Sequence, residues 1–179
     1  MEDVQLIELA LGGNTDAFSR LVRKYQDRLY NALAHAMGSS DDAADVVQET
    51  FVQAFVKLET FERRASFFTW LYRIAINRSI SQRRRQRPER SLDRLRDETT
   101  LEVPDDSMPP DGPMNQRERA MQVQTALSSL GEEFRQVLVL REMEALTYEQ
   151  IAEMLTVPVG TVKTRMRMAL GKLREVLEE

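Results

Sequence analysis

Apolar positions recur every three or four residues along most of the chain, which is the spacing of amphipathic helices. The first half predicts four helices, over 3–11, over 14–37, after the capping residues 39–42, and over 67–85. No strand pair and no Asn-Gly hairpin signal interrupts this pattern. The apolar residues that define the four helices are Val4, Ile7, Leu9 and Leu11; Phe18, Leu21, Val22, Tyr25, Leu29, Leu33 and Met37; Ala44, Val47, Phe51, Ala54, Phe55 and Leu58; and Phe67, Leu71, Ile74, Ala75 and Ile80.

The pattern stops over residues 88–113, which hold five of the six prolines and eight acidic residues against three arginines. Such a composition is typical of an extended linker. Helical periodicity resumes at about Met114, with a break at Gly131. The sequence therefore predicts an all-α protein with two small helical domains, 1–87 and 114–179, joined by a flexible acidic linker.

Residues 147–174 have the pattern of a helix-turn-helix. Thr147 and Gln150 have the spacing of a capping box, and Pro158 suits the start of a second helix that runs to about Leu177. An ordinary helical hairpin with a solvated basic face is the alternative interpretation. The second helix is expected to direct Val162, Met166, Leu170, Leu173 and Leu177 inward and Thr161, Lys163, Thr164, Arg165, Arg167 and Lys172 outward.

Composition excludes several classes of site. The chain has no cysteine, so a disulfide scaffold, a cysteine-ligated zinc site and thiol chemistry are ruled out, and a single histidine disfavours a histidine-based site. No run approaches the roughly 20 apolar residues that span a bilayer, and the N-terminus lacks the basic start of a signal peptide. We expect a cytoplasmic protein without a cofactor and without membrane insertion.

Charge is strongly segregated, although the net charge is only −4. Residues 61–90 carry nine arginines against two glutamates, and residues 158–174 carry five basic residues and no acid. Residues 41–59 are acidic. Two basic blocks on an acidic protein favour a polyanion partner for the basic parts and a different, basic partner for the acidic part.

Three features of the N-terminal half suggest what these partners are. An acidic polar stripe follows the third helix, and it suits a basic protein surface rather than phosphate. Aromatic residues are interleaved with arginines at 61–73, which suits unstacked single-stranded bases. Asn77 can contact a base edge, and the arginines that follow can hold phosphates. Each feature also has a structural interpretation, since the stripe can be solvated, Trp70 can pack in the core, and the arginines at 83–87 can flank a linker.

The strings DAADVVQETFVQAF, SFFTWLYRIAIN and LTYEQIAEMLTVPVGTVKTR resemble those of bacterial extracytoplasmic-function (ECF) sigma factors, the small two-domain initiation factors of RNA polymerase. The resemblance covers nearly the whole chain, in the same order. It implies that the N-terminal domain binds the clamp helices of the largest polymerase subunit and melts and recognises the minus-ten promoter element. It implies that the C-terminal domain recognises the minus-thirty-five element and meets the polymerase flap. Many members are also held inactive by an anti-sigma factor.

The resemblance places the clamp-binding stripe on Asp45, Gln48 and Glu49. It places minus-ten recognition on Asn77 and the loop 61–66, and minus-thirty-five recognition at the start of the last helix. The loop reads FERRAS where the family often has glycine and an acid, and Met168 stands where relatives often have arginine. Together with the aromatic and basic positions above, the candidate minus-ten residues are Phe61, Arg63, Arg64, Ser66, Trp70, Arg73, Asn77 and Arg84, and the candidate minus-thirty-five residues are Thr161, Lys163, Thr164, Arg165 and Arg167.

The sequence therefore predicts a promoter-specificity subunit that has no catalytic chemistry of its own. A stand-alone helix-turn-helix regulator that binds duplex DNA is the alternative, but it needs neither the acidic stripe nor the aromatic–basic segment. A nucleic-acid-modifying enzyme lacks a suitable set of catalytic residues. In the family the acidic linker is thought to mimic nascent RNA inside the polymerase, and a soluble spacer is the other interpretation.

Overall fold

The computed structural model describes residues 2–86, 122–123 and 125–178. Every regular element in these residues is helical, which confirms the all-α class. None of the helices in this part of the chain is both long and apolar enough to cross a membrane. The predicted linker, 88–113, lies outside the described residues, so its character and the domain boundaries stay predictions.

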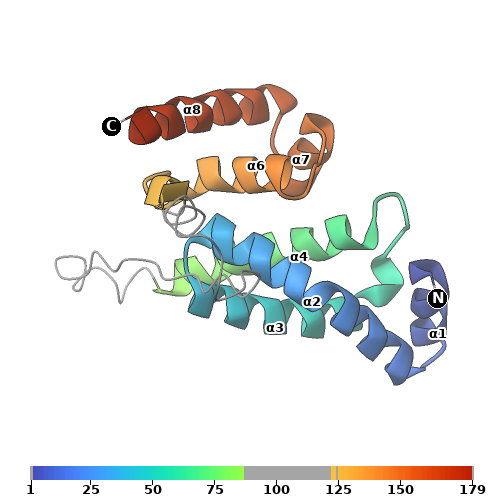
Figure 1. Ribbon diagram of the computed structural model, residues 1–179. Coiled ribbons are helices and arrows are strands. Elements are labelled where there is room, and N and C mark those ends of the chain that lie inside the picture. Colours follow the sequence, from blue (N-terminus) through green and yellow to red (C-terminus); the bar gives the residue numbers. More distant parts are fainter. Residues whose placement is uncertain (1, 87–121, 124, 179) are drawn as a thin grey trace, which may run out of the picture. The chain divides into compact units, whose positions relative to one another are not determined.

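The chain divides into two compact units. The first comprises Met1–Asn31 and Asp41–Thr99, and the second comprises Ala32–Ser40 and Thr100–Glu179. Figure 1 shows the elements of the N-terminal half, with α1 beside the start of α2 and with α3 and α4 alongside α2. These elements are α1 (Asp3–Leu11), α2 (Thr15–Met37), α3 (Ser40–Val56), the 3-10 turn η1 (Leu58–Thr60) and α4 (Phe67–Gln86).

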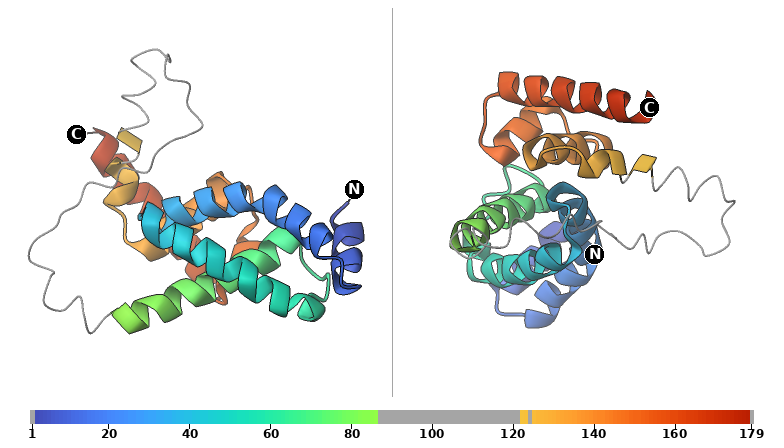
Figure 2. Two further views of the ribbon diagram at one scale, coloured as in Figure 1. Left: turned by 90° about the horizontal axis from the view of Figure 1, so that it is seen from below. Right: turned by 90° about the vertical axis from the view of Figure 1, so that its left-hand side faces the viewer.

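Aromatic contacts join the three long helices of the first unit. Phe18 of α2 meets Phe55 of α3 edge-on, with ring centroids 5.0 Å apart, and Tyr25 of α2 lies 5.4 Å from Phe67 of α4. Leucines from α2 and α4, among them Leu21, are completely buried beside them. The two views of Figure 2 show the same side-by-side arrangement of α2, α3 and α4. Burial of these large side chains is the main stabilising contribution to the bundle.

The predicted apolar stripes are correct in period but wrong in phase at several positions. In α1 the buried face is formed by Leu6, Ile7 and Ala10. Successive residues of a helix point about 100° apart, so a stripe that is assigned one residue too early or too late faces solvent instead of the core. The apolar residues that define the predicted helices but are exposed are Val4, Leu9 and Leu11 of α1, Ala44 and Phe55 of α3, and Ile80 of α4.

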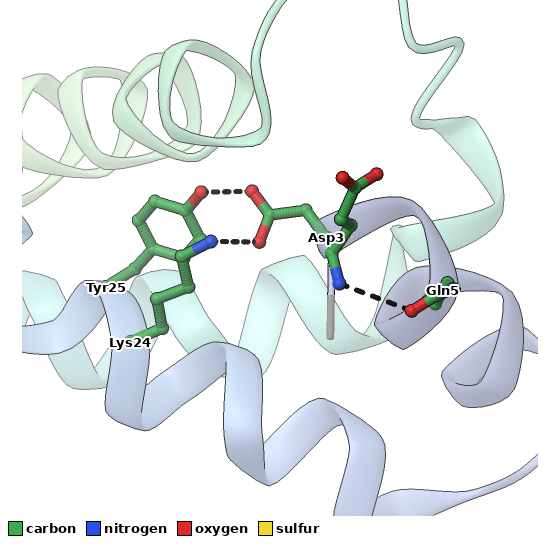
Figure 3. Close-up of polar contacts among 5 residues, drawn as sticks. Asp3, Gln5, Lys24 and Tyr25 are labelled. Atoms are coloured by element: carbon green, nitrogen blue, oxygen red, sulfur yellow. Dashed lines mark hydrogen bonds and ion pairs between the residues drawn. The ribbon is translucent and has the colours of Figure 1, made fainter.

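A polar cluster fastens α1 to α2. The Asp3 carboxylate accepts a hydrogen bond from the Tyr25 hydroxyl and forms an ion pair with Lys24, whose Nζ lies 2.5 Å from Oδ1. Figure 3 shows these contacts beside the hydrogen bond from the Glu2 N–H to the Gln5 side chain, which closes the start of α1. Since α1 also packs against η1, the cluster holds α1 where the chain enters the loop before α4.

We expect Asp3→Asn to destabilise the protein at neutral pH and to have little effect in strong acid. Burial acts to raise the pKa of the Asp3 carboxyl, but hydrogen bonds from Lys24 and Tyr25 and the Lys24 charge outweigh it and lower the pKa below the ordinary value of 3.8. A lowered pKa stabilises the folded state above the unfolded pKa, and this stabilisation is lost as the pH falls through the folded pKa.

Chemical unfolding of the wild type and of Asp3→Asn from pH 7 to pH 2 measures this effect. The difference in unfolding free energy should be about 1 kcal/mol at pH 7 and should shrink below about pH 4. A difference that stays constant over the whole range would show that the carboxylate charge plays no part.

The helices of the C-terminal half described in the structure are α6 (Glu132–Glu142), α7 (Tyr148–Leu155) and α8 (Val159–Glu178), and α6 and α7 both pack on α8. The predicted capping box is confirmed, because the Gln150 N–H donates to Thr147 Oγ1 at 3.2 Å and the Thr147 N–H donates to Gln150 Oε1 at 2.8 Å. Thr156 ends α7 with a left-handed φ of 56°. The Pro158 carbonyl then accepts the first hydrogen bonds of α8. This is the predicted helix-turn-helix.

The buried stripe of α8 consists of Val162, Met166 and Ala169, with Leu173 half-buried. The prediction that Leu170 points inward is wrong, since it is 46% exposed. Seven residues after Val162 the helix has returned to within about 20° of the same direction, whereas eight residues after it the offset is about 80°. The small Ala169 therefore occupies the inward position.

Candidate polymerase and promoter interfaces

The acidic stripe lies where the sequence predicts it. Asp45, Gln48 and Glu49 are exposed on α3, the last two about one turn after the first, opposite the buried Val46, Val47 and Phe51. Glu49 differs from its neighbours, because its Oε2 lies 2.8 Å from Nη2 of Arg78 on α4. The stripe therefore borders the helix that carries the predicted minus-ten residues.

An aromatic cluster joins the loop 61–66 to the start of α4. The Phe61 ring lies 5.6 Å from Phe67 in an edge-on arrangement and 5.3 Å from Trp70, which in turn lies 5.6 Å from Phe67. Phe67 is buried, whereas Phe61 and Trp70 are half-buried. Each of these two rings thus packs on Phe67 and keeps part of its surface accessible, so the packing considered for Trp70 is observed and its stacking on a base stays a prediction.

The loop 61–66 is anchored at two points, and it contains one ion pair of its own. Ser66 caps α4, since its Oγ accepts from the Thr69 N–H at 3.1 Å and lies 2.9 Å from the Thr69 hydroxyl. Arg63 has a left-handed φ of 59°, and its guanidinium donates to Glu8 of α1 at 3.1 Å. Arg64 pairs with Glu62 at 2.9 Å and is largely exposed. The loop therefore owes its position to α1 as well as to α4.

Arg73 and Asn77 continue from Trp70 along one exposed side of α4. Residues three and seven positions apart share a face of a helix, so the three side chains form one line that leads away from the loop. The candidate Arg84 belongs to the last turns of α4, but its side chain lies outside the described residues. The structure thus brings the other minus-ten candidates together on the loop and one face of α4.

The minus-thirty-five candidates occupy the first two turns of α8. Lys163, Thr164 and Arg167 are exposed, and Thr161 is half-buried near the turn. Arg165 is directed towards α6, where its Nη2 lies 2.9 Å from Oε2 of Glu133, and its side chain is 24% exposed.

Lys172 also lies on the α6 side of α8, with its Nζ 5.3 Å from the centre of the Phe134 ring. The basic side of α8 is therefore divided between an outward face and an edge that contacts α6. The expectation that Arg165 points simply outward is wrong, whereas Lys172 is exposed as expected.

The sequence interpretation missed three ion pairs that hold the basic candidates or their neighbours. Glu8, Glu49 and Glu133 pair with Arg63, Arg78 and Arg165, each from a different helix. No local spacing signals these pairs, because the partners are far apart in sequence. Within the described residues no three side chains of His, Cys, Asp or Glu are placed to hold a metal ion.

Comparisons with known proteins agree with this arrangement. Residues 21–89 match the family model "Sigma-70 region 2", and residues 126–175 match "Sigma-70, region 4". The chain is 33% identical to the ECF RNA polymerase sigma factor SigW of Bacillus subtilis, over 93% of this chain and 92% of that protein. The chain belongs to the ECF sigma factors of RNA polymerase. It therefore directs transcription initiation, as the sequence resemblance predicted, and the stand-alone regulator is not favoured.

Two further relatives cover nearly the whole chain. The RNA polymerase sigma-H factor of Pseudomonas aeruginosa is 35% identical over 99% of this chain and 94% of that protein. The sigma factor RpoE of Bartonella quintana, solved with the anti-sigma factor NepR, is similar in structure, with a TM-score of 0.73 and 25% identity over 90% of this chain and 96% of that one.

Proposed function

We propose that this ECF sigma factor binds core RNA polymerase through the stripe Asp45, Gln48 and Glu49, and opens promoter DNA on the neighbouring face of α4. The observation that carries the proposal is that an acidic stripe and an aromatic–basic line are both exposed on two helices that touch each other. A stripe of acids suits a basic protein surface, and partly exposed rings beside arginines suit unstacked bases.

In this proposal Phe61 and Trp70 offer surfaces for a base that leaves the duplex, and the arginines around them neutralise the backbone. Unpairing a base costs a few kcal/mol, which stacking and hydrogen bonds to the exposed base can repay. Asn77 contacts a base edge, because its amide presents a donor and an acceptor side by side. The residues assigned to this surface are Phe61, Arg63, Arg64, Ser66, Trp70, Arg73, Asn77 and Arg84.

The second unit is proposed to bind duplex DNA at the minus-thirty-five element. In a helix-turn-helix the opening turns of the second helix enter the major groove. Lys163, Thr164 and Arg167 are exposed there, and Glu133 fixes the Arg165 guanidinium at the edge of the same surface. Thr161 lies at the start of this helix, where it suits a phosphate contact.

The chain supplies no catalytic group in this proposal, because phosphodiester synthesis belongs to the polymerase. It works in the cytoplasm, where polymerase and promoters are found. The likeness to a sigma factor solved with its anti-sigma factor supports a similar inhibitor as a partner of this chain.

We expect Asp45→Lys to weaken binding to core polymerase about tenfold, equivalent to about 1.4 kcal/mol. The substitution turns an attractive charge into a repulsive one on an exposed helix face, so the fold should persist. Asp45 is the better site for this test than Glu49, because a lysine at position 49 would also repel Arg78.

Fluorescence titration of labelled protein with core polymerase measures this effect, and Asp27→Lys is the matched control. Asp27 is exposed on α2, outside every assigned surface. Equal losses for the two variants would remove the stripe from the polymerase interface.

A further inference from the structure

Arg78 takes part in none of the functions assigned above, yet its position links the two surfaces of the first unit. It follows Asn77 directly on α4, and its Nη2 lies 2.8 Å from Oε2 of Glu49 on α3. The Arg78 side chain is 33% exposed, and its Nε is buried without a hydrogen-bond partner among the described residues. Arg78 is thus held mainly by one carboxylate.

That carboxylate belongs to the surface proposed for polymerase. Glu49 is 55% exposed and lies one turn beyond Asp45 on the same side of α3. A basic surface that docks on the stripe therefore competes with Arg78 for Glu49. Water screens a partly exposed ion pair and leaves it with little net stability, so exchange of one cation for another is inexpensive.

Once Arg78 is released from Glu49, its positive charge can bind another anion. Its planar guanidinium suits phosphate oxygens, which it can bind through two parallel hydrogen bonds. Because Arg78 adjoins Asn77, the nearest polyanion in an initiation complex is the backbone of the promoter strand at the minus-ten element.

We propose that Arg78 is a further promoter-contacting residue, which Glu49 holds in the free protein and which docking of polymerase on the stripe releases to a DNA phosphate. The inference rests on the proposed function, since it takes the stripe as the polymerase surface and α4 as the promoter surface. It adds a reason for the free protein to bind DNA weakly until polymerase is bound.

The test uses the full chain without polymerase and a fluorescein-labelled single-stranded oligothymidylate, with anisotropy measured over a salt series. Glu49→Gln removes the restraint and keeps the side-chain volume. It should bind several-fold more tightly than the wild type. Its plot of log affinity against log salt should be steeper by about 0.7, the change expected for one added phosphate contact on a single strand.

Two variants separate this mechanism from a general change of charge. Asp41→Asn removes one negative charge from the same exposed side of α3, outside the assigned residues, and should leave the salt slope unchanged. Glu49→Gln in an Arg78→Gln background should add nothing to the slope of Arg78→Gln alone. Circular dichroism of each variant checks that the helices are intact.

In polymerase saturated with the sigma factor and bound to promoter DNA, the order of the salt slopes should differ from that of the free proteins. Wild type and Glu49→Gln should have the same salt slope, because polymerase has already released Arg78, whereas Arg78→Gln should have a shallower one. A Glu49→Gln slope equal to that of Asp41→Asn, or a steepening that survives Arg78→Gln, would overturn the inference. Failure of the proposed function is distinguishable, because the wild-type holoenzyme would then select no promoter.

Discussion

Asn77→Ala is expected to reduce open-complex formation by about one to two orders of magnitude while leaving polymerase affinity unchanged. A lost base contact with two hydrogen bonds is worth about 1–3 kcal/mol. Asn77 is exposed on α4, in line with Trp70 and Arg73, so its truncation leaves the helical core intact. The loss should therefore appear at the step where the duplex opens.

Permanganate reactivity of promoter thymines in the holoenzyme complex measures this step. Gln26→Ala, which removes an exposed amide from α2, is the control and should melt the promoter as the wild type does. Wild-type reactivity in the Asn77→Ala complex would exclude a base contact at this position.

Arg165→Ala is expected to lower activity at cognate promoters and to relax discrimination at one position of the minus-thirty-five element. Arg165 lies in the opening turns of α8, and Glu133 fixes its guanidinium, which favours a defined contact with a base edge. Since Glu133 is 55% exposed, the loss of its partner costs little stability. Promoters with the preferred base should thus lose about 1–3 kcal/mol of binding free energy, whereas promoters with another base at that position should be unaffected.

Arg174→Ala is the matched comparison, because Arg174 is exposed about two to three turns later on the same helix. It should weaken all promoters about equally and reduce the salt slope by about 0.9 if one duplex phosphate contact is lost. Glu133→Gln should have a smaller effect than Arg165→Ala, but it should relax discrimination at the same position of the minus-thirty-five element. If Arg165→Ala reduced every promoter variant by one common factor, Arg165 would be a backbone contact.

The helical framework follows from local features of the sequence. The double glycine at 12 and 13 ends α1, and the pair Thr147 and Gln150 starts α7 with the expected reciprocal hydrogen bonds. These signals act within one turn of helix, so they depend little on the rest of the fold. The order of the helices and the helix-turn-helix were predictable for this reason.

The direction of individual side chains was less predictable. Leu170 was expected in the core, but Ala169 occupies that position, because the packing of α8 selects between adjacent residues that a rough period cannot separate. Phe55 is similar, since it contacts Phe18 but remains half exposed. Such choices depend on the shapes of the neighbouring helices, which are set by tertiary contacts.

The ion pairs of the candidate site depend entirely on tertiary structure. Arg63, Arg78 and Arg165 all belong to the basic blocks of the sequence, yet each is held by a glutamate from another helix. The charge count predicts a polyanion partner but not which arginines are restrained in the free protein. The site assignments themselves stay predictions, and the variants above test them one surface at a time.

The most direct measurement is transcription by core RNA polymerase with and without this chain on fragmented genomic DNA, with every transcript start sequenced. We predict that addition of the chain creates a discrete set of new starts, each preceded by the same two sequence elements at a constant separation. Unchanged starts, together with binding of the chain alone to specific duplex sites, would contradict a promoter-specificity subunit.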